Sequence, residues 1–483
     1  MSESAFNARK GRSVDLLTGT PWKKIGLFAV PLIIGNIFQQ LYNTADSVIV
    51  GRNVGHTALA AVGVSSPMLF LLVSVFMGVA TGSSVLVAQY FGARNLNGLR
   101  KVLHTSILLA VVVGLILSMI GYFLAPAFLN LLNTPKDTYG LALEYMRILF
   151  LGIIGQMLYN MVSGFMRGMG NARTPLYILI AASVTNVVLD LIFIIPLQMG
   201  VAGAAWATII SQMMSAILVM TALHRAGPLT RITKSELKID LQTTKDIVTI
   251  GVPTAIQQGI ISLGGVVIQG LVNSYGTYMI AGHNAAMRVD MFAVMPIMSF
   301  SMAMVSYTGQ NVGAGKMDRV YKGVRHGLGL LIGVTIITTT VLFFFAKNVL
   351  QLFTDDVQTL EAGNMIIRTI VPFYVLFAIN QTLGGIMRGA GETVVPMINA
   401  LLMNILVRVP LAFVLNNIMQ VPQAIYLSQV GGWIVGVTLM LIFYKRGSWE
   451  RKALARIEIL QKLDENALTQ DRAHFERELS AET

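Results

Sequence analysis

Long runs of apolar residues, separated by short polar stretches, occupy the chain from about residue 25 to residue 445. The stretches 178–195 and 328–345 are two such runs. A run of about 20 apolar residues forms a helix that can cross the ~30 Å hydrocarbon core of a bilayer. The pattern therefore predicts an all-α polytopic membrane protein with twelve transmembrane helices. We expect these helices at 25–50, 58–88, 101–126, 140–166, 174–197, 201–223, 244–272, 278–308, 323–346, 360–387, 395–416 and 424–444.

The composition agrees with a membrane protein. The chain is 54% hydrophobic and only 12% charged, whereas a soluble domain carries about 25% charged residues. Cysteine is absent, which excludes a disulfide framework and a thiolate metal site. A net charge of +12 would suggest nucleic acid as the partner of a soluble protein. Here the positions of the basic residues explain the charge by membrane topology, and we expect no nucleic-acid partner.

Lysine and arginine are distributed unevenly between the loops on the two sides of the predicted helices. Three of them, Arg52, Lys136 and Lys347, fall on one side, and fifteen fall on the other. The positive-inside rule therefore places both termini in the cytoplasm, and it predicts a multi-pass protein of the cytoplasmic (inner) membrane. The fifteen basic residues are Arg94, Arg100, Lys101, Arg167, Arg173, Arg225, Arg231, Lys234, Lys238, Lys245, Lys316, Arg319, Lys322, Arg325 and Arg388.

The chain contains an internal repeat. GFMRGMGNARTP at 164–175 returns as GIMRGAGETVVP at 385–396, and AQYFGARN at 88–95 returns as GQNVGAGK at 309–316. Six helices per copy let both copies enter the membrane from the same side, so we expect two parallel six-helix repeats, an N-lobe and a C-lobe, around a central cleft. The expected parts are a cytoplasmic N-terminal segment (1–24), the N-lobe (25–223), a cytoplasmic linker (224–243), the C-lobe (244–445) and a charged cytoplasmic tail (446–483).

Three acidic residues, Asp46, Asp190 and Asp290, lie well inside predicted helices. Ionisable residues in the membrane are costly and usually mark an ion or substrate path. Asp190 belongs to the apolar stretch NVVLDLIFI, residues 186–194. Asn186 precedes it by four residues and therefore shares its helix face.

Helices 1, 5 and 6 are predicted to build one polar cluster. At 1.5 Å per residue, Asp46, Asp190 and Thr208 all lie ~9–11 Å below the outer surface. Tyr42 shares a helix face with Asp46, as Asn186 does with Asp190. We expect these five side chains to form a binding site. The alternative is that each aspartate only hydrogen-bonds to a neighbouring helix and stabilises the packing of the two helices.

The chemistry of this cluster suits a small cation. Carboxylate, amide and hydroxyl oxygens are ligands that sodium accepts, so Asp46, Asp190, Asn186 and Thr208 are the ligands if the ion is sodium. Two adjacent buried carboxylates can instead hold a proton between them. The stretch GQNVGAGKM (309–317) lacks the spacing of a phosphate-binding loop. We therefore expect no enzymatic activity and no cofactor, and any pumping must draw on an ion gradient.

The second half lacks matching acids, because position 268, opposite Asp46 in the repeat, is isoleucine. Its one deep carboxylate, Asp290, either contacts the substrate or forms an interhelical ion pair with Arg408. Met287 and Met291 begin a methionine stripe at helical spacing. Such a stripe either lines an adaptable substrate cavity or packs between helices.

Over about residues 20–445 the sequence resembles the multidrug and toxic compound extrusion (MATE) family, and within it the DinF-like branch. The resemblance implies an ion-responsive polar network in the N-lobe. The NorM-like branch places acids on helices 7 and 10, whereas here helix 7 has none beyond its first turn and helix 10 has none near Phe377. The resemblance rests on the doubled twelve-helix layout together with AVP (29–31), YNTADSVIVGR (42–52), AQYFGARN, MRGMGNARTP, NVVLDLIF, GVAGAAWAT (200–208), MRGAGETVVP and VRVPLA (407–412).

The resemblance also assigns residues. It implies that a helix-4 asparagine of the network is Asn160, although the estimated depth of Asn160 differs from that of the other members. It implies that helix 1 bends at Pro31. The remaining network residues carried over from the family are Tyr42, Asp46, Asn186, Asp190 and Thr208.

The function implied by the resemblance is cation-coupled antiport that exports organic, often cationic and lipophilic, compounds by alternating access. Such multidrug efflux would confer resistance to antibiotics. We expect a monomer whose partners are small-molecule drugs and membrane lipid. A flippase for a lipid-linked intermediate is the alternative, and a passive channel is a third option. A flippase needs a basic groove, for which Arg147, Arg288, Arg368 and Arg408 are a weak basis.

Overall fold

The computed structural model describes residues 13–227 and 230–463, and this part of the chain contains helices and no strand. Twelve helices within it are long and apolar enough to cross a membrane, which confirms the predicted fold class. They are α2 (Pro21–Asn53), α3 (His56–Gly92), α4 (Leu96–Leu131), α5 (Lys136–Gly168), α6 (Arg173–Ile194), α7 (Gly200–Arg225), α8 (Leu241–Asn273), α9 (Thr277–Gly313), α10 (Met317–Leu350), the pair α11 (Val357–Ile370) and α12 (Tyr374–Gly389), the pair α13 (Val394–Leu401) and α14 (Arg408–Met419), and α15 (Gln423–Lys445).

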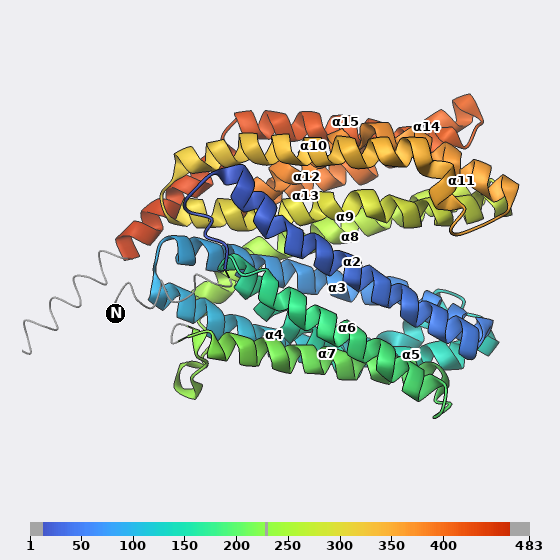
Figure 1. The fold of residues 1–483 in the computed structure, drawn as a ribbon, viewed down its shortest axis with the longest axis horizontal. Coiled ribbons are helices and arrows are strands. Elements are labelled where there is room, and N and C mark those ends of the chain that lie inside the picture. The colour runs from blue at the N-terminus through green and yellow to red at the C-terminus, as the bar shows by residue number, and fades with distance from the viewer. Residues whose placement is uncertain (1–12, 228–229, 464–483) are drawn as a thin grey trace, which may run out of the picture.

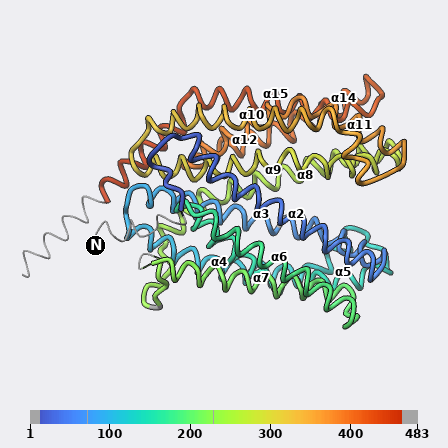
Figure 2. Tube along the Cα trace, in the orientation of Figure 1, coloured from blue at the N-terminus to red at the C-terminus, as the bar shows by residue number. Residues whose placement is uncertain are grey.

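The helices form two bundles, an N-lobe of α2–α7 and a C-lobe of α8–α15 (Figure 1). The lobes meet at the end of the molecule where both described termini lie, called the terminal end below. They diverge toward the opposite end, called the far end (Figure 2). At the terminal end α3 crosses α9 so closely that a Cβ on Gly92 would lie 2.0 Å from the Gln310 carbonyl oxygen. Only glycine permits this approach of two backbones.

Prolines shape several of the helices. Pro31 lies inside α2 and Pro253 inside α8, where each ring removes an i to i−4 hydrogen bond and favours a bend. The predicted helix 360–387 is two helices, α11 and α12, joined by a short 3-10 turn that contains Pro372. The continuous helices expected from apolar periodicity are thus interrupted where proline removes a backbone donor.

The predicted helix 395–416 is also interrupted. A π-helical segment, Leu402–Val407, separates α13 from α14. Pro410 follows one turn later, and its nitrogen cannot donate to the carbonyl of Leu406. The wider π turn accommodates that missing bond, and such turns are frequent at functional sites. Arg408 is the first residue after it.

Large apolar side chains cover the outside of the bundles. Phe123, Phe344 and Ile337 are 71%, 69% and 67% exposed. A monomeric soluble protein rarely exposes apolar surface on this scale. The exposure is the expected property of helices that face lipid tails.

Beyond α15, residues 448–463 form a helix that packs against the terminal end. This C-terminal helix follows a turn at Gly447, whose φ is +69°, and Trp449 at its start is only 1% exposed. The charged tail predicted at 446–483 is therefore helical and packed in its first half. Residues 464–483, the first 12 residues of the N-terminal segment and residues 228–229 of the linker lie outside the described residues.

Candidate cation and substrate sites

A cavity of about 190 Å³ inside the N-lobe brings together most of the predicted polar residues. Tyr42 of α2, Asn160 of α5, Asn186 of α6 and Thr208 of α7 all line it. Asn160, whose estimated depth differs, belongs to the same cavity because the cavity extends along α2 as far as Pro31.

Asp46 and Asp190 meet one helical turn beyond this cavity, toward the far end. Each aspartate follows a cavity-lining residue by four positions, Asp46 after Tyr42 and Asp190 after Asn186. The two carboxyl groups lie within hydrogen-bonding reach of each other. Asp190 is fully buried and Asn186 is 2% exposed. The structure thus brings together α2 and α6 through the pair of acids expected from the sequence.

Within residues 13–227 and 230–463, no basic side chain forms an ion pair with this carboxyl pair. Five buried atoms make no hydrogen bond to any described residue, namely Oδ1 of Asp46, Oδ1 and Nδ2 of Asn186, and both carboxylate oxygens of Asp190. A buried polar atom without a partner costs about 1–3 kcal/mol, and more when it is charged. Two facing carboxylates cannot satisfy one another because neither carries a donor. A shared proton or a small cation would give these atoms a partner.

An apolar cluster closes the site toward the far end. Tyr145 is 5% exposed and packs with Val50, Leu149, Ile194 and Val201. The Tyr145 hydroxyl lies within electrostatic range of both carboxylates. This cluster lies between the pair and the far end, whereas the cavity lined by Tyr42 and Asn186 lies on the other side of the pair.

The cavity has further polar residues that the sequence analysis did not select. Gln156, Ser183 and Gln212 line it, together with Arg167 near its terminal end. Gln156 precedes Asn160 by four residues, Ser183 precedes Asn186 by three, and Gln212 follows Thr208 by four. Helical spacing from the selected residues is thus a signal that could have found them.

The ligand count fits a monovalent ion. Among the described residues, no group of three or more His, Cys, Asp or Glu side chains is arranged to hold a metal ion. The pair offers two carboxylates, with the neutral oxygens of Asn186 and Thr208 nearby. One positive charge leaves such a site with a small residual charge, so a proton or sodium fits it better than a transition metal.

The acid of the C-lobe has a different environment. Asp290 lies on α9 beside the C-lobe core, since Ala286 and Ala293, one turn away on either side, are buried in that core. Arg408 is near enough to attract the carboxylate. No Lys, Arg or His nitrogen of the described residues lies within 4.0 Å of Asp290, and its Oδ1 is buried without a hydrogen bond. The expected ion pair is thus a longer-range attraction.

Arg408 belongs to a hydrogen-bonded group between α9, α14 and α15. Its Nη2 donates to Oε1 of Gln429 at 2.9 Å. Nearby, Nδ1 of His283 and the hydroxyl of Tyr426 lie 2.9 Å apart. The C-lobe therefore encloses a positive charge next to its one deep acid.

The methionine stripe of α9 faces two environments. Met287 is half-buried against the C-lobe core, whereas Met291 is 44% exposed. Further along, Met298 accepts a hydrogen bond from Gln381 at 3.0 Å, and Met302 lines the N-lobe cavity. Both interpretations made from the sequence are thus compatible with the structure, each for part of the stripe.

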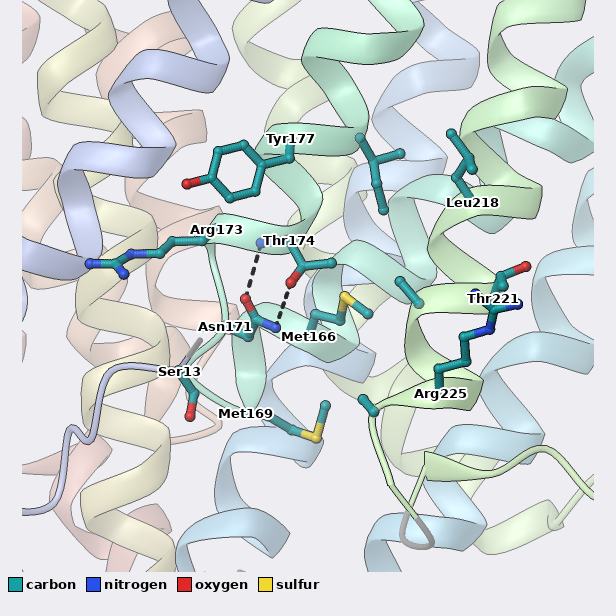
Figure 3. A pocket seen from close by; sticks show the side chains of 13 residues that line it. Ser13, Met166, Met169, Asn171, Arg173, Thr174, Tyr177, Leu218, Thr221 and Arg225 are labelled. Atoms are coloured by element: carbon teal, nitrogen blue, oxygen red, sulfur yellow. Dashed lines mark hydrogen bonds between the residues drawn. The ribbon is translucent and has the colours of Figure 1, made fainter. Parts of the chain in front are cut away.

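A larger pocket, about 900 Å³, opens at the terminal end between α5, α6 and α7 (Figure 3). Arg173 and Arg225 line it and extend in different directions. Asn171 and Thr174 hydrogen-bond to one another at the start of α6. None of the predicted site residues lines this pocket, and none of its lining residues is a buried acid. Size alone does not make this pocket a functional site.

The doubled set of helices agrees with the comparison with known proteins. The MatE family model matches residues 31–192 and, a second time, residues 253–414. The chain belongs to the MATE family. The double match confirms the internal repeat predicted from the sequence. It also confirms that this protein is a transporter and not an enzyme, because MATE proteins are membrane transporters.

Individual relatives extend over nearly the whole chain. The probable multidrug resistance protein YoeA of Bacillus subtilis is 29% identical over 449 residues, covering 90% of this chain and 96% of YoeA. The probable multidrug resistance protein NorM of Thermotoga maritima is 28% identical over 455 residues, covering 91% of this chain and 96% of NorM. A solved structure described as the outward-facing conformation of a multidrug resistance MATE family transporter superposes with a TM-score of 0.84 at 25% identity, covering 93% and 99%.

Proposed function

We propose that this MATE transporter is a cation-coupled antiporter that exports organic, often cationic and lipophilic, compounds. The observation that carries the proposal is the Asp46–Asp190 pair, whose carboxyl groups are in contact inside the N-lobe without a described counter-charge. Tyr42, Asn186 and Thr208, the residues that the resemblance to the DinF-like branch assigns to the same network, line the cavity next to the pair and support the proposal. Multidrug relatives support the class of substrate.

The proposed orientation places the terminal end in the cytoplasm. The positive-inside count supports it, because the basic loops adjoin that end. The lobes then meet on the cytoplasmic side and diverge toward the outside (Figure 1), which corresponds to an outward-facing state. A cysteine introduced in place of Lys136, at the far end, checks this orientation. It should react with an impermeant reagent added outside the cell.

Coupling follows from electrostatics. With both carboxylates charged, repulsion in a low-dielectric site favours separation of α2 from α6. A proton or sodium ion from outside removes that repulsion and lets the two helices close, with α2 bending at Pro31. Substrate and ion then stabilise different arrangements of the N-lobe. By linkage, an ion that weakens substrate binding is itself bound less tightly when substrate is present, which is the requirement for antiport.

The C-lobe supplies the proposed substrate contacts. Asp290 attracts a positive group, and Arg408 limits how strongly it does so. Met287 and Met291 offer polarisable apolar surface that adapts to different shapes. Selectivity in this proposal resides mainly in the C-lobe and coupling in the N-lobe.

Transport by the purified protein in liposomes tests the function. A cationic lipophilic dye is offered with an imposed proton gradient, an imposed sodium gradient, both or neither. We expect the dye to move in the direction opposite to the ion that drives it, and we expect one of the two gradients to be sufficient. Dye movement that is equal under all four conditions would exclude coupling, and no movement of any cationic dye together with movement of a lipid-linked substrate would favour the flippase alternative.

A further inference from the structure

Two equivalent glutamines close the terminal end. Nε2 of Gln89 in the N-lobe donates to the carbonyl of Gly389 in the C-lobe at 3.1 Å. Nε2 of Gln310 in the C-lobe donates to the carbonyl of Gly168 in the N-lobe at 2.8 Å. Both pairs are related by the same offset of 221 residues. The closure is therefore a symmetric pair of hydrogen bonds between the lobes, which alternating access has to break.

The symmetry ends at the amide oxygens of these glutamines. Oε1 of Gln310 is buried and makes no hydrogen bond to any described residue. Oε1 of Gln89 accepts a hydrogen bond of 2.9 Å from Nε of Arg456. Arg456 belongs to the C-terminal helix, residues 448–463, which has no counterpart in the first repeat. One of the two gate glutamines thus has a charged partner from outside the repeat.

Arg456 is held by both lobes. Its guanidinium lies 4.9 Å from the ring centre of Tyr90 on α3, and its Nη1 lies 3.5 Å from Oδ2 of Asp246 on α8. The Arg456 side chain is only 13% exposed. A charge-assisted hydrogen bond in so protected a place is stronger than one at the open surface.

The start of the C-terminal helix is fixed to the C-lobe. Trp449 stacks on Tyr444 with ring centres 5.2 Å apart, and Glu450 accepts a hydrogen bond from Tyr321. One turn before Arg456, Lys452 pairs with Glu392 at 3.1 Å. The helix is therefore anchored on the C-lobe and reaches the N-lobe through Arg456.

We propose that the C-terminal helix is a latch on the closed side of the transporter, with Arg456 as the residue that positions Gln89. Arginine only donates hydrogen bonds, so it fixes the amide of Gln89 with Oε1 toward itself. The amide nitrogen must then face the carbonyl of Gly389. Arg456 thereby strengthens the bond between the lobes and raises the population of the state closed at the terminal end.

The proposal rests on the alternating-access transport proposed above, and a distance measurement tests it without transport. The chain has no cysteine, so cysteines at Asn97 and Asp318, both exposed and equivalent in the two repeats, accept spin labels. In lipid nanodiscs, Arg456→Ala should raise the ratio of the long inter-lobe distance to the short one about ten-fold, the effect of losing one hydrogen bond to a charged group. Arg451→Ala is the matched control, because Arg451 lies on the same helix and its side chain, among the described residues, donates only to the carbonyl of Arg446.

Two further variants test whether Arg456 acts by positioning Gln89 or by holding the two lobes together in general. Arg456→Lys keeps the positive charge near Asp246 and Tyr90 but lacks the Nε–H donor, so it should shift the distances in the same direction by a smaller factor. In a Gln89→Ala background, Arg456→Ala should add less than a two-fold further change, because its partner is already absent. Equal effects of Arg456→Ala with and without Gln89 would show that Arg456 does not act through this glutamine. Unchanged distances in Arg456→Ala would overturn the latch, and loss of ion coupling at Asp46 and Asp190 would leave this measurement unaffected.

Discussion

The two lobes differ in their buried charged groups. The N-lobe site contains two acids, and the C-lobe site contains one acid and one arginine. In the N-lobe, Asp46 and Asp190 face each other, and no basic side chain of the described residues forms an ion pair with them. In the C-lobe, Asp290 lies in the field of Arg408. An acid pair without a counter-charge can accept a proton or a cation, whereas Asp290 already lies near a positive charge. The same architecture therefore holds buried acids in two different charge environments.

A pair with the same spacing and the opposite charge occurs in the C-lobe, three residues out of register with the repeat. Asn186 and Asp190 are four residues apart, and so are Asn404 and Arg408. Both pairs follow equivalent prolines, Pro175 and Pro396, although the second pair lies three residues closer to its proline. The scaffold is thus duplicated, while the charged residues on these helices differ between the lobes.

The largest expected effect comes from removing the uncompensated charge. Asp190→Asn keeps the shape and imitates the neutralised form, so gradient-driven export in vesicles should fall to background while the protein still folds and inserts. Asp137→Asn, an exposed acid at the start of α5, is the matched control and should export at the parent rate. Export by Asp190→Asn at the parent rate with the same gradient dependence would show that this aspartate only stabilises helix packing.

The compensated acid should behave differently. Asp290→Asn leaves Arg408 without its opposite charge and makes the C-lobe more positive. Transport of cationic drugs should fall about ten-fold relative to neutral ones, the scale of one lost ionic contact of about 1.4 kcal/mol. The ion dependence of the remaining transport should survive, as measured with paired proton and sodium gradients. Loss of coupling with an unchanged drug profile would reverse the roles assigned to the two lobes.

Neutral members of the N-lobe site should matter less than the acids. Asn186→Ala and Thr208→Ala each remove one uncharged oxygen, worth about 1 kcal/mol as a ligand or hydrogen-bond partner. We expect each to raise the ion concentration needed for half-maximal export about five-fold without abolishing coupling. Ion titration of vesicle transport measures this shift. An effect as large as that of Asp190→Asn would mean that the amide or hydroxyl is itself essential to coupling.

The sequence predicts much of this architecture, because apolar runs and basic loops reflect physical requirements of the bilayer. Depth along the helices also predicts that Asp46 and Asp190 are neighbours, since both lie equally far from the outer ends of their helices. The interruption at Leu402–Val407 is not predicted, because apolar periodicity does not distinguish an α turn from a π turn. The contact between Arg456 and Gln89 is not predicted either, since it joins residues 367 positions apart through a tail that carries no repeat signal.

The smallest expected difference between the lobes concerns how their first helices begin. α8 starts at Asp240, whose Oδ2 accepts the backbone N–H of Thr243 at 3.0 Å, while Thr20, at the equivalent place before α2, makes no such side-chain bond. Hydrogen bonds from the Thr243 hydroxyl and backbone hold the pKa of Asp240 below its usual value. The stabilisation is therefore fully present above the pKa of an unfolded aspartate, about 3.9, and is lost as the pH falls through the lower pKa of the folded state.

Asp240→Ala should cost about 1 kcal/mol of stability near pH 7, the usual value of an N-cap, and Thr20→Ala should cost less than half of that. Thermal unfolding of both variants in detergent at pH 7 and near pH 3 measures the difference, which should shrink at the lower pH. A penalty for Asp240→Ala that is equal at both pH values would mean that packing in the linker, and not the charged cap, stabilises the start of the C-lobe.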